Sequence, residues 1–286
     1  MTILVTGASG KSGQAVVRAL KRAGATTRAF IHRQEQEPQM RALGAAEVVV
    51  GDLRDEQALA QAMRDIHAVY HICPAMQPEE TEIGQRMIAL AKTAGVSHFV
   101  YYSVLHPQTA ALPHHTLKLH VETALVQSNL PFTILQPASY MQNILMDRAR
   151  IREQGIYTTS YGLNARMSLV DLDDVGEVAA HVLTEDGHRY ATYELSGPEV
   201  LTAADMADIL SRVLGRPVSA ENMDIDRWAQ QMRTHGMSDY AVTTLATMFR
   251  YYADHGFAGN PNVLAMLLKR PPTTFAQFVA REMAQA

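Results

Sequence analysis

The sequence predicts an α/β fold: a doubly wound parallel sheet of the Rossmann type with a smaller, mainly helical lobe toward the C-terminus. Three observations predict it. Short, β-rich apolar runs alternate with helical stretches through the first half of the chain. These runs are almost continuously apolar, as in strands covered on both faces. From Thr202 onward the pattern is mostly helical.

The first half contains six expected strands joined by helices. The strands are Ile3–Thr6, Thr26–His32, Glu47–Val50, Ala68–Cys73, His98–Ser103 and Phe132–Leu135. The helices are Lys11–Ala23, Gln39–Leu43, Glu56–Met63, Glu79–Ala94 and His114–Gln127. The first helix shows the basis of the assignment, because Ala15, Val16, Ala19 and Leu20 recur at helical spacing.

The regular alternation of expected strands and helices ends after Pro137. We expect a helix over Tyr140–Ile151, a polar, turn-rich stretch over Gly155–Asn164, and a strand over Met167–Val170. Further expected elements are a helix over Asp171–Leu183, a strand over Tyr193–Ser196, and helices over Ala203–Leu214, Asp224–Thr234, Asp239–Asp254 and Phe275–Met283. The expected dinucleotide-binding domain is 1–138 plus about 166–185, and the substrate lobe is about 139–165 and 188–286.

Composition narrows the classes of function. The 286 residues carry a net charge of -4 and no run rich in Lys or Arg, which disfavours nucleic acid as a partner. No apolar run approaches the roughly 18–20 residues that a membrane span needs. The single cysteine, Cys73, cannot form an internal disulfide, and no charged leader precedes the first strand. We therefore expect a cytoplasmic protein.

A glycine-rich turn joins the first expected strand to the first helix. In this turn Gly7 permits the tight exit from the strand, Gly10 lets the backbone approach a pyrophosphate, and Gly13 allows close packing of the helix. The N–H groups at the start of the helix would face the phosphates. The expected cofactor-binding turn consists of Gly7, Ser9, Gly10, Lys11, Ser12 and Gly13. A glycine-rich turn without a ligand is the alternative.

The choice of cofactor depends on the end of the second strand. NAD sites usually carry Asp or Glu about 20 residues after the glycines. Here that distance reaches His32 and Arg33, and a cation suits a 2′-phosphate. We predict NADP(H) as the preferred cofactor, with NAD(H) as the alternative if Arg33 is only a solvated surface residue. Asp52 either accepts from the adenine amino group or caps the helix that begins near Asp55.

Several segments carry a resemblance to a known family. They are Thr6–Gly13, Gly51–Leu53, Ala94–Val100, Leu135–Pro137, Tyr140–Asn143, Ser196–Pro198 and Arg270–Phe275. With these segments the chain resembles, over nearly its whole length, the NmrA-like group of atypical short-chain dehydrogenases. That group includes quinone reductases, a triphenylmethane dye reductase, azo reductases, and non-catalytic regulators that sense the cofactor.

The resemblance implies a set of site residues, with one departure. Typical short-chain dehydrogenases carry Tyr-x-x-x-Lys, whereas here His114 stands in the Tyr position and Lys118 in the Lys position. The expected catalytic residues are Lys118, His114 and Ser103. The remaining cofactor positions implied are His32, Arg33, Asp52, Leu53, Cys73, Lys118, Pro137 and Tyr140. The substrate positions implied are Tyr140, Met141 and Asn143. An ion pair between Lys118 and Glu122, one turn away, is the plainer interpretation of that helix face.

Two functions of different classes fit these features. The first is an NADPH-dependent reductase that passes hydride to a flat, electron-poor aromatic molecule, which needs no strong proton donor on oxygen. The alternative is a non-catalytic NADP(H)-binding redox sensor that acts through a protein partner. A sugar-nucleotide epimerase ranks third because the Tyr is missing. We expect no metal, since His114, His115 and His120 have no acidic or cysteine ligands beside them. The chain is expected to be a monomer or a homodimer.

Overall fold

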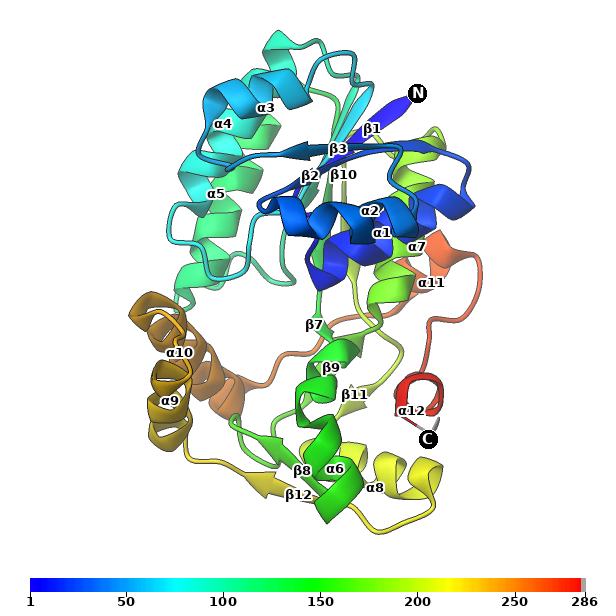
Figure 1. The fold of residues 1–286 in the computed structure, drawn as a ribbon. Helices are drawn as coiled ribbons and strands as arrows, with labels where there is room; N and C mark the ends of the chain where they lie inside the picture. Colours follow the sequence, from blue (N-terminus) through cyan, green and yellow to red (C-terminus); the bar gives the residue numbers. More distant parts are fainter. Residues whose placement is uncertain (284–286) are drawn as a thin grey trace. The chain divides into compact units, whose positions relative to one another are not determined.

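The computed structural model describes residues 1–283, which fold into two compact units (Figure 1). The sheet unit consists of Met1–Thr109, His115–Pro137 and Leu172–Glu194. The second unit consists of Ala110–His114, Ala138–Asp171 and the chain from Leu195 onward. The predicted fold class is confirmed, because the sheet unit is built on a seven-stranded, doubly wound sheet.

The central sheet has the strand order β10-β6-β5-β4-β1-β2-β3. Its strands are β1 (Thr2–Val5), β2 (Thr26–Ile31), β3 (Glu47–Val50), β4 (Ala68–His71), β5 (His98–Tyr102), β6 (Phe132–Pro137) and β10 (Ala191–Leu195). The pairs from β3 across to β6 are all parallel. The strand order reverses between β1 and β4, which is where ligands bind in open α/β sheets.

Helices cover both faces of this sheet (Figure 1). On one face lie α3 (Glu56–Ala62), α4 (Glu80–Thr93) and α5 (Pro113–Gln127). The other face carries α1 (Lys11–Arg22) and α7 (Leu172–Thr184), and η1 (Gln34–Gln36) with α2 (Glu37–Leu43) follow β2. A buried core joins the sheet to α3, α4 and α5 through side chains such as Phe30, Phe99, Met87 and Leu125. The sheet is therefore covered on both sides, as its apolar strands require.

The second unit combines small sheets with helices. It contains a three-stranded sheet of β11 (Val200–Leu201), β9 (Met167–Val170) and β7 (Ser139–Tyr140), and a two-stranded sheet of β12 (Ser219–Asn222) and β8 (Ile156–Thr159). Its helices are η2 (Met141–Asp147), α6 (Arg148–Gln154), α8 (Ala203–Leu214), α9 (Ile225–Thr234), α10 (Asp239–His255), α11 (Asn262–Leu268) and α12 (Phe275–Met283). The helical character expected from Thr202 onward is present.

The structure corrects several expected elements. The segment expected as one helix over Tyr140–Ile151 is the short strand β7, then η2, then α6. The stretch Gly155–Asn164 contains strand β8, which pairs with β12 some sixty residues further along the chain. The sixth strand, expected over Phe132–Leu135, extends to Pro137. Met167–Val170 lies in the second unit rather than the dinucleotide-binding domain, because β9 pairs with β7 and β11.

Candidate functional site

The glycine-rich turn occupies the edge of the sheet unit at the strand reversal. Gly7 has φ +57°, a conformation that favours glycine, and a Cβ there would lie 2.9 Å from the Ile72 carbonyl oxygen. A Cβ on Gly13 would lie 2.3 Å from the Gly7 carbonyl oxygen. A Cβ on Gly10 would meet only that same oxygen, at 3.3 Å, within 4 Å. The turn is therefore closed on the protein side and open beside Gly10, where a pyrophosphate would approach.

The start of α1 is also suited to an anion. Gly10 is its N-cap residue, and no side chain in the described part of the chain caps this end. The first intrahelical bond runs from the Gln14 N–H to the Gly10 carbonyl. The Gln14 side chain donates to the Ser9 carbonyl at 2.7 Å, and the Tyr102 hydroxyl donates to Ser12 Oγ at 3.2 Å. The turn is thus held from two sides, and the first N–H groups of the helix have no carbonyl partner within the helix.

Behind the turn, β1 and β4 are joined by a buried polar contact. Thr6 Oγ1 lies 2.9 Å from His71 Nδ1 and accepts the Ile72 N–H at 3.0 Å. Burial lowers the pKa of His71 to about 3, so its ring is neutral. The contact fixes the ends of the two strands between which the cofactor would lie. Sequence reasoning did not find His71, because it lies in an apolar strand with no motif around it.

The residues expected to choose the cofactor follow β2. Because β1 and β2 pair in parallel, with Val5 opposite Ala29, the glycine turn and His32 follow neighbouring strand ends. His32 and Arg33 are both exposed. Within residues 1–283, no ion pair engages the Arg33 guanidinium. An exposed, unpaired guanidinium at this edge is what recognition of a 2′-phosphate requires.

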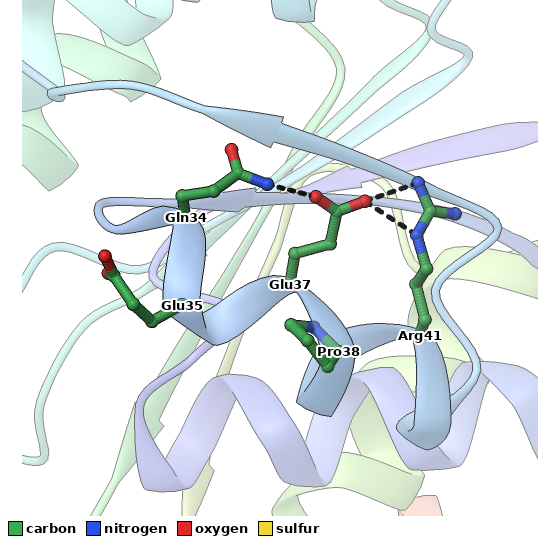
Figure 2. Close-up of a pocket in the computed structure, with 5 residues that line it drawn as sticks. All are labelled: Gln34, Glu35, Glu37, Pro38 and Arg41. Carbon is green, nitrogen blue, oxygen red and sulfur yellow. Dashed lines mark hydrogen bonds and ion pairs between the residues drawn. The ribbon is translucent and has the colours of Figure 1, made fainter.

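A pocket follows Arg33 directly in the chain and is lined by Gln34, Glu35, Glu37, Pro38 and Arg41 (Figure 2). The Glu37 carboxylate accepts from Arg41 Nε at 2.7 Å and from the Gln34 amide on its other side. Glu35 takes no part in this set. The polar groups of the pocket therefore largely satisfy one another.

Asp52 follows β3 at the same edge of the sheet, because Ile31 pairs with Val50. Its carboxylate accepts from Arg54 three times, from the backbone N–H, Nε and Nη2, at 2.8, 3.0 and 2.6 Å. These hydrogen bonds lower the pKa of Asp52 to about 2. The expected alternative role as a helix cap is wrong, because Asp55 caps α3 by accepting from the N–H groups of Gln57 and Ala58. Leu53, expected as a cofactor position, is buried.

Lys118 is one half of a buried ion pair. Its Nζ lies 2.6 Å from Glu80 Oε1, and the two side chains are 6% and 1% exposed. The same Glu80 oxygen accepts from the Tyr101 hydroxyl at 2.9 Å, and Lys118 also donates to the Tyr102 carbonyl at 3.2 Å. The expected ion pair with Glu122 is replaced by one with Glu80, which α4 presents from its first turn. The ammonium is thereby held at the end of β5.

Ser103 joins a second buried cluster at the end of β5. Its hydroxyl donates to Glu122 Oε1. Gln136 donates its amide to both Glu122 oxygens, at 2.9 and 3.1 Å. Burial raises the pKa of Glu122, and the two hydrogen-bond donors together with the charge of Lys118 only partly offset this. The single hydroxyl proton of Ser103 is therefore committed to Glu122, which leaves the hydroxyl only as an acceptor.

The structure also places the other expected residues. His114 is buried on α5, one turn before Lys118. Cys73 follows β4, is buried and free, and burial raises the pKa of its thiol. Pro137 ends β6 in the sheet unit. The expected substrate residues belong to the second unit: Tyr140 is half-buried, Met141 is buried and Asn143 is exposed.

Sequence reasoning missed Glu80 and Gln136 as site neighbours. Glu80 stands at a helix start, where an acidic residue is explained by the helix dipole alone. Two further observations concern the described residues only. No helix among them is both long and apolar enough to span a membrane. No group of three or more potential metal-ligating side chains is placed around one point within residues 1–283.

Known proteins match this architecture along its length. The NAD(P)H azoreductase of Xenophilus azovorans is 29% identical over 287 residues, covering 99% of this chain and 98% of the relative. The crystal structure of an NADPH-dependent quinone oxidoreductase from Escherichia coli, complexed with NADPH, matches with a TM-score of 0.85 and 26% identity over 98% of this chain and 99% of that chain.

A third match bears on the fold alone. The triphenylmethane reductase of Citrobacter sp., complexed with NADP(H), has a TM-score of 0.85 at 24% identity over 98% of this chain and 99% of that chain. The NmrA-like family itself matches residues 1–279. The resemblance drawn from the glycine turn and the later segments is confirmed: the chain belongs to the NmrA-like family.

Proposed function

We propose that this protein is an NADPH-dependent reductase that passes hydride to a flat, electron-poor aromatic acceptor such as a quinone, an azo compound or a dye. The observation that carries the proposal is the glycine turn. It is closed behind Gly7 and Gly13, open beside Gly10, and continues into an uncapped helix start. The azoreductase and the quinone oxidoreductase named above support the class of reaction.

The residues of the turn fit a dinucleotide. The leading N–H groups of α1 would bind the pyrophosphate, and the helix dipole favours its charge. Arg33, which no ion pair engages within residues 1–283, would bind the 2′-phosphate as a fork of donors. Asp52 keeps its carboxylate ionised, and we propose that it accepts from the adenine amino group while paired with Arg54. These roles make NADP(H) the preferred cofactor.

The end of β5 provides a fixed cation. Glu80 and the Tyr102 carbonyl hold the Lys118 ammonium, and we propose that Lys118 positions the nicotinamide ribose. Bound NADPH supplies the hydride. Because a quinone or dye is already electrophilic, the protein needs chiefly to align the two molecules and exclude water. His114 would donate the proton that completes the reduction, with Tyr140 and Asn143 contacting the acceptor.

The single, buried Cys73 supports the cytoplasm as the proposed compartment, since the chain cannot form an internal disulfide. The substrate class is a small aromatic molecule. A redox sensor acting through a protein partner is the outcome that the experiment below separates from catalysis. Its signature would be clearly different affinities for NADPH and NADP⁺ with no acceptor reduced.

The first test is calorimetric titration of the purified protein, freed of carried-over cofactor, with NADPH, NADP⁺, NADH and NAD⁺. We expect NADPH to bind at least about tenfold more tightly than NADH, a difference of about 1.4 kcal/mol. Arg33→Asp should lose that margin, because it replaces the phosphate-binding cation by an anion. Arg227→Asp on α9 makes the same charge change at an exposed site and serves as the matched control.

The second arm follows NADPH oxidation over a panel of benzoquinones, azo compounds and triphenylmethane dyes. Turnover with at least one class supports the reductase. Binding of NADPH without turnover on any of them would contradict it. If NADH binds more tightly, or if Arg33→Asp leaves the preference unchanged, the proposed role of Arg33 is wrong whatever the acceptor panel shows.

A further inference from the structure

The segment Tyr140–Asn143 is held to its own unit by little backbone pairing. Strand β7 has only two residues, with Ser139 opposite Leu169 and Tyr140 opposite Val170 on β9. It continues directly into η2, a 3₁₀ helix whose N-cap residue, Tyr140, makes no side-chain cap. A 3₁₀ helix of seven residues is longer than is usual and has weak internal hydrogen bonds. Side-chain contacts must therefore contribute to its position.

Such a contact is made by Asp171, which follows β9. Its side chain is 0% exposed. Asp171 Oδ1 accepts a hydrogen bond from the amide of Gln142, which lies within the segment Tyr140–Asn143, at 2.7 Å. Arg281 binds the same carboxylate as a fork, Nη1 to Oδ2 at 2.7 Å and Nη2 to Oδ1 at 3.2 Å. A buried carboxylate with this many charge-assisted bonds is a rigid junction.

Arg281 comes from α12, the helix at the far end of the described chain. Its guanidinium lies 5.4 Å from the centre of the Phe278 ring, and Phe278 is fully buried together with Phe275 and Val279. Glu282 accepts from Arg281 Nε at 2.8 Å and further limits its rotation. One carboxylate therefore links α12, β9 and the start of η2. All three lie in the second unit.

We propose that Arg281 and Asp171 are positioning residues for the acceptor: they fix Gln142, and through it the segment Tyr140–Asn143, in the place that sets acceptor affinity. This inference rests on the proposed function, in which that segment contacts the acceptor. Arg281 touches neither cofactor nor acceptor in this account. The C-terminal helix thus contributes to substrate binding through two side chains rather than by direct contact.

The experiment compares Gln142→Met, Arg281→Met and Arg281→Lys in the full-length protein. Gln142→Met cuts the link to η2 and leaves the Arg281–Asp171 ion pair intact. We expect Gln142→Met, which removes one charge-assisted hydrogen bond, to raise the KM for a quinone about tenfold with kcat little changed. Arg281→Met, which removes both bonds of the fork to Asp171, should raise the KM at least as much. The Kd for NADPH should change far less than the KM, because the glycine turn and Arg33 supply the main cofactor contacts in the proposed function. Arg281→Lys should raise the KM less than Arg281→Met does, because lysine keeps a cation beside Asp171.

Hydrogen–deuterium exchange of the peptide covering 139–147 gives a readout that does not need turnover. Exchange should rise in both methionine variants. Arg250→Met is the matched control, because it removes an exposed arginine that pairs with Asp226 on the surface of the same unit. It should leave exchange and KM unchanged. If Arg281→Met only lowers the melting temperature, with exchange at 139–147 as in the wild type, the role is structural and the inference fails.

The two proposals fail in different ways. A wild-type protein that reduces no acceptor contradicts the proposed function, while the exchange experiment still decides whether Arg281 fixes the segment. A wild-type protein that reduces quinones, with Gln142→Met unchanged in both KM and exchange, contradicts the inference alone. If Arg281→Met does not fold, Gln142→Met and Arg281→Lys carry the test.

Discussion

Two buried carboxylates near the end of β5 have opposite environments. Glu80, on α4, shares one oxygen between the Lys118 ammonium and the Tyr101 hydroxyl. Glu122, on α5, accepts only from neutral donors, the Ser103 hydroxyl and the Gln136 amide. Each carboxylate accepts from a hydroxyl on or just after β5, so the difference between them is that the Lys118 ammonium binds Glu80 directly. The end of β5 therefore carries the Lys118–Glu80 ion pair beside the Glu122 carboxyl, whose pKa burial raises toward the neutral form.

Breaking the charged pair should give the largest effect. Lys118→Met leaves a buried Glu80 carboxylate without its cation, and we expect the free energy of unfolding to fall by about 3–5 kcal/mol. Glu80→Gln alone should also destabilise, because it leaves the ammonium buried. The double variant Glu80→Gln/Lys118→Met keeps an acceptor for Tyr101 and should recover most of the loss.

Urea unfolding without cofactor gives the free energy of unfolding of the wild type, the two single variants and the double variant, which form a double-mutant cycle. The coupling between the two sites then isolates the pair itself. A Lys118→Met variant less than about 1 kcal/mol below the wild type would mean that the pair is solvated, as surface pairs are. Loss of NADPH affinity in the stable double variant would support the proposed role of Lys118 at the ribose, separately from its role in folding.

The comparison also shows what the sequence could predict. The parallel sheet was predictable because its strands are short apolar runs separated by helical stretches, and the glycine turn has a fixed spacing. Lys118 and Ser103 followed from the family pattern. Glu80 did not, because its contact with Lys118 depends on α4 packing beside α5, where Gly84 allows Val121 to approach closely. Contacts between side chains 38 residues apart have no local signal.

The second unit was less predictable for a related reason. Strand β12, Ser219–Asn222, is polar and mostly exposed, so no apolar alternation marks it. It forms because Gly155 and Ile156 lie beside it, with Ser219 paired to Ile156. Within Tyr140–Ile151 only the last residues are α-helical, in α6, whereas Tyr140 pairs with β9 and Met141–Asp147 form the 3₁₀ helix η2. In both cases tertiary pairing outweighed local propensity.

Removing the Ser103 hydroxyl should lower the free energy of unfolding less than breaking the Lys118–Glu80 pair. Ser103→Ala takes one donor from Glu122 and should cost about 1 kcal/mol, the usual net contribution of an intramolecular hydrogen bond. Because the hydroxyl proton is committed to Glu122, we expect kcat for a quinone to fall far less than the roughly 100-fold typical of losing an acid–base group. Steady-state kinetics with saturating NADPH would check this, and a 100-fold fall would restore Ser103 as a catalytic residue.

At neutral pH, Glu122→Gln should change the free energy of unfolding least of these variants, in contrast to Lys118→Met. A neutral amide of the same size replaces a carboxylate whose ionisation is opposed by burial, so we expect a change of less than about 1 kcal/mol. The sign depends on pH. The folded state raises the pKa of Glu122, so the protonated carboxyl stabilises the fold below the ordinary glutamate pKa. That contribution is lost as the pH rises through the raised value.

The wild type should therefore gain stability relative to Glu122→Gln in acid, over the range between the ordinary and the raised pKa, and the difference should level off above it. Unfolding midpoints of the two proteins across this range measure it directly, since other titrating groups cancel in the comparison. A difference that grows with rising pH would mean that Glu122 is stabilised as a carboxylate. The two carboxyls would then differ only in their partners and not in their charge.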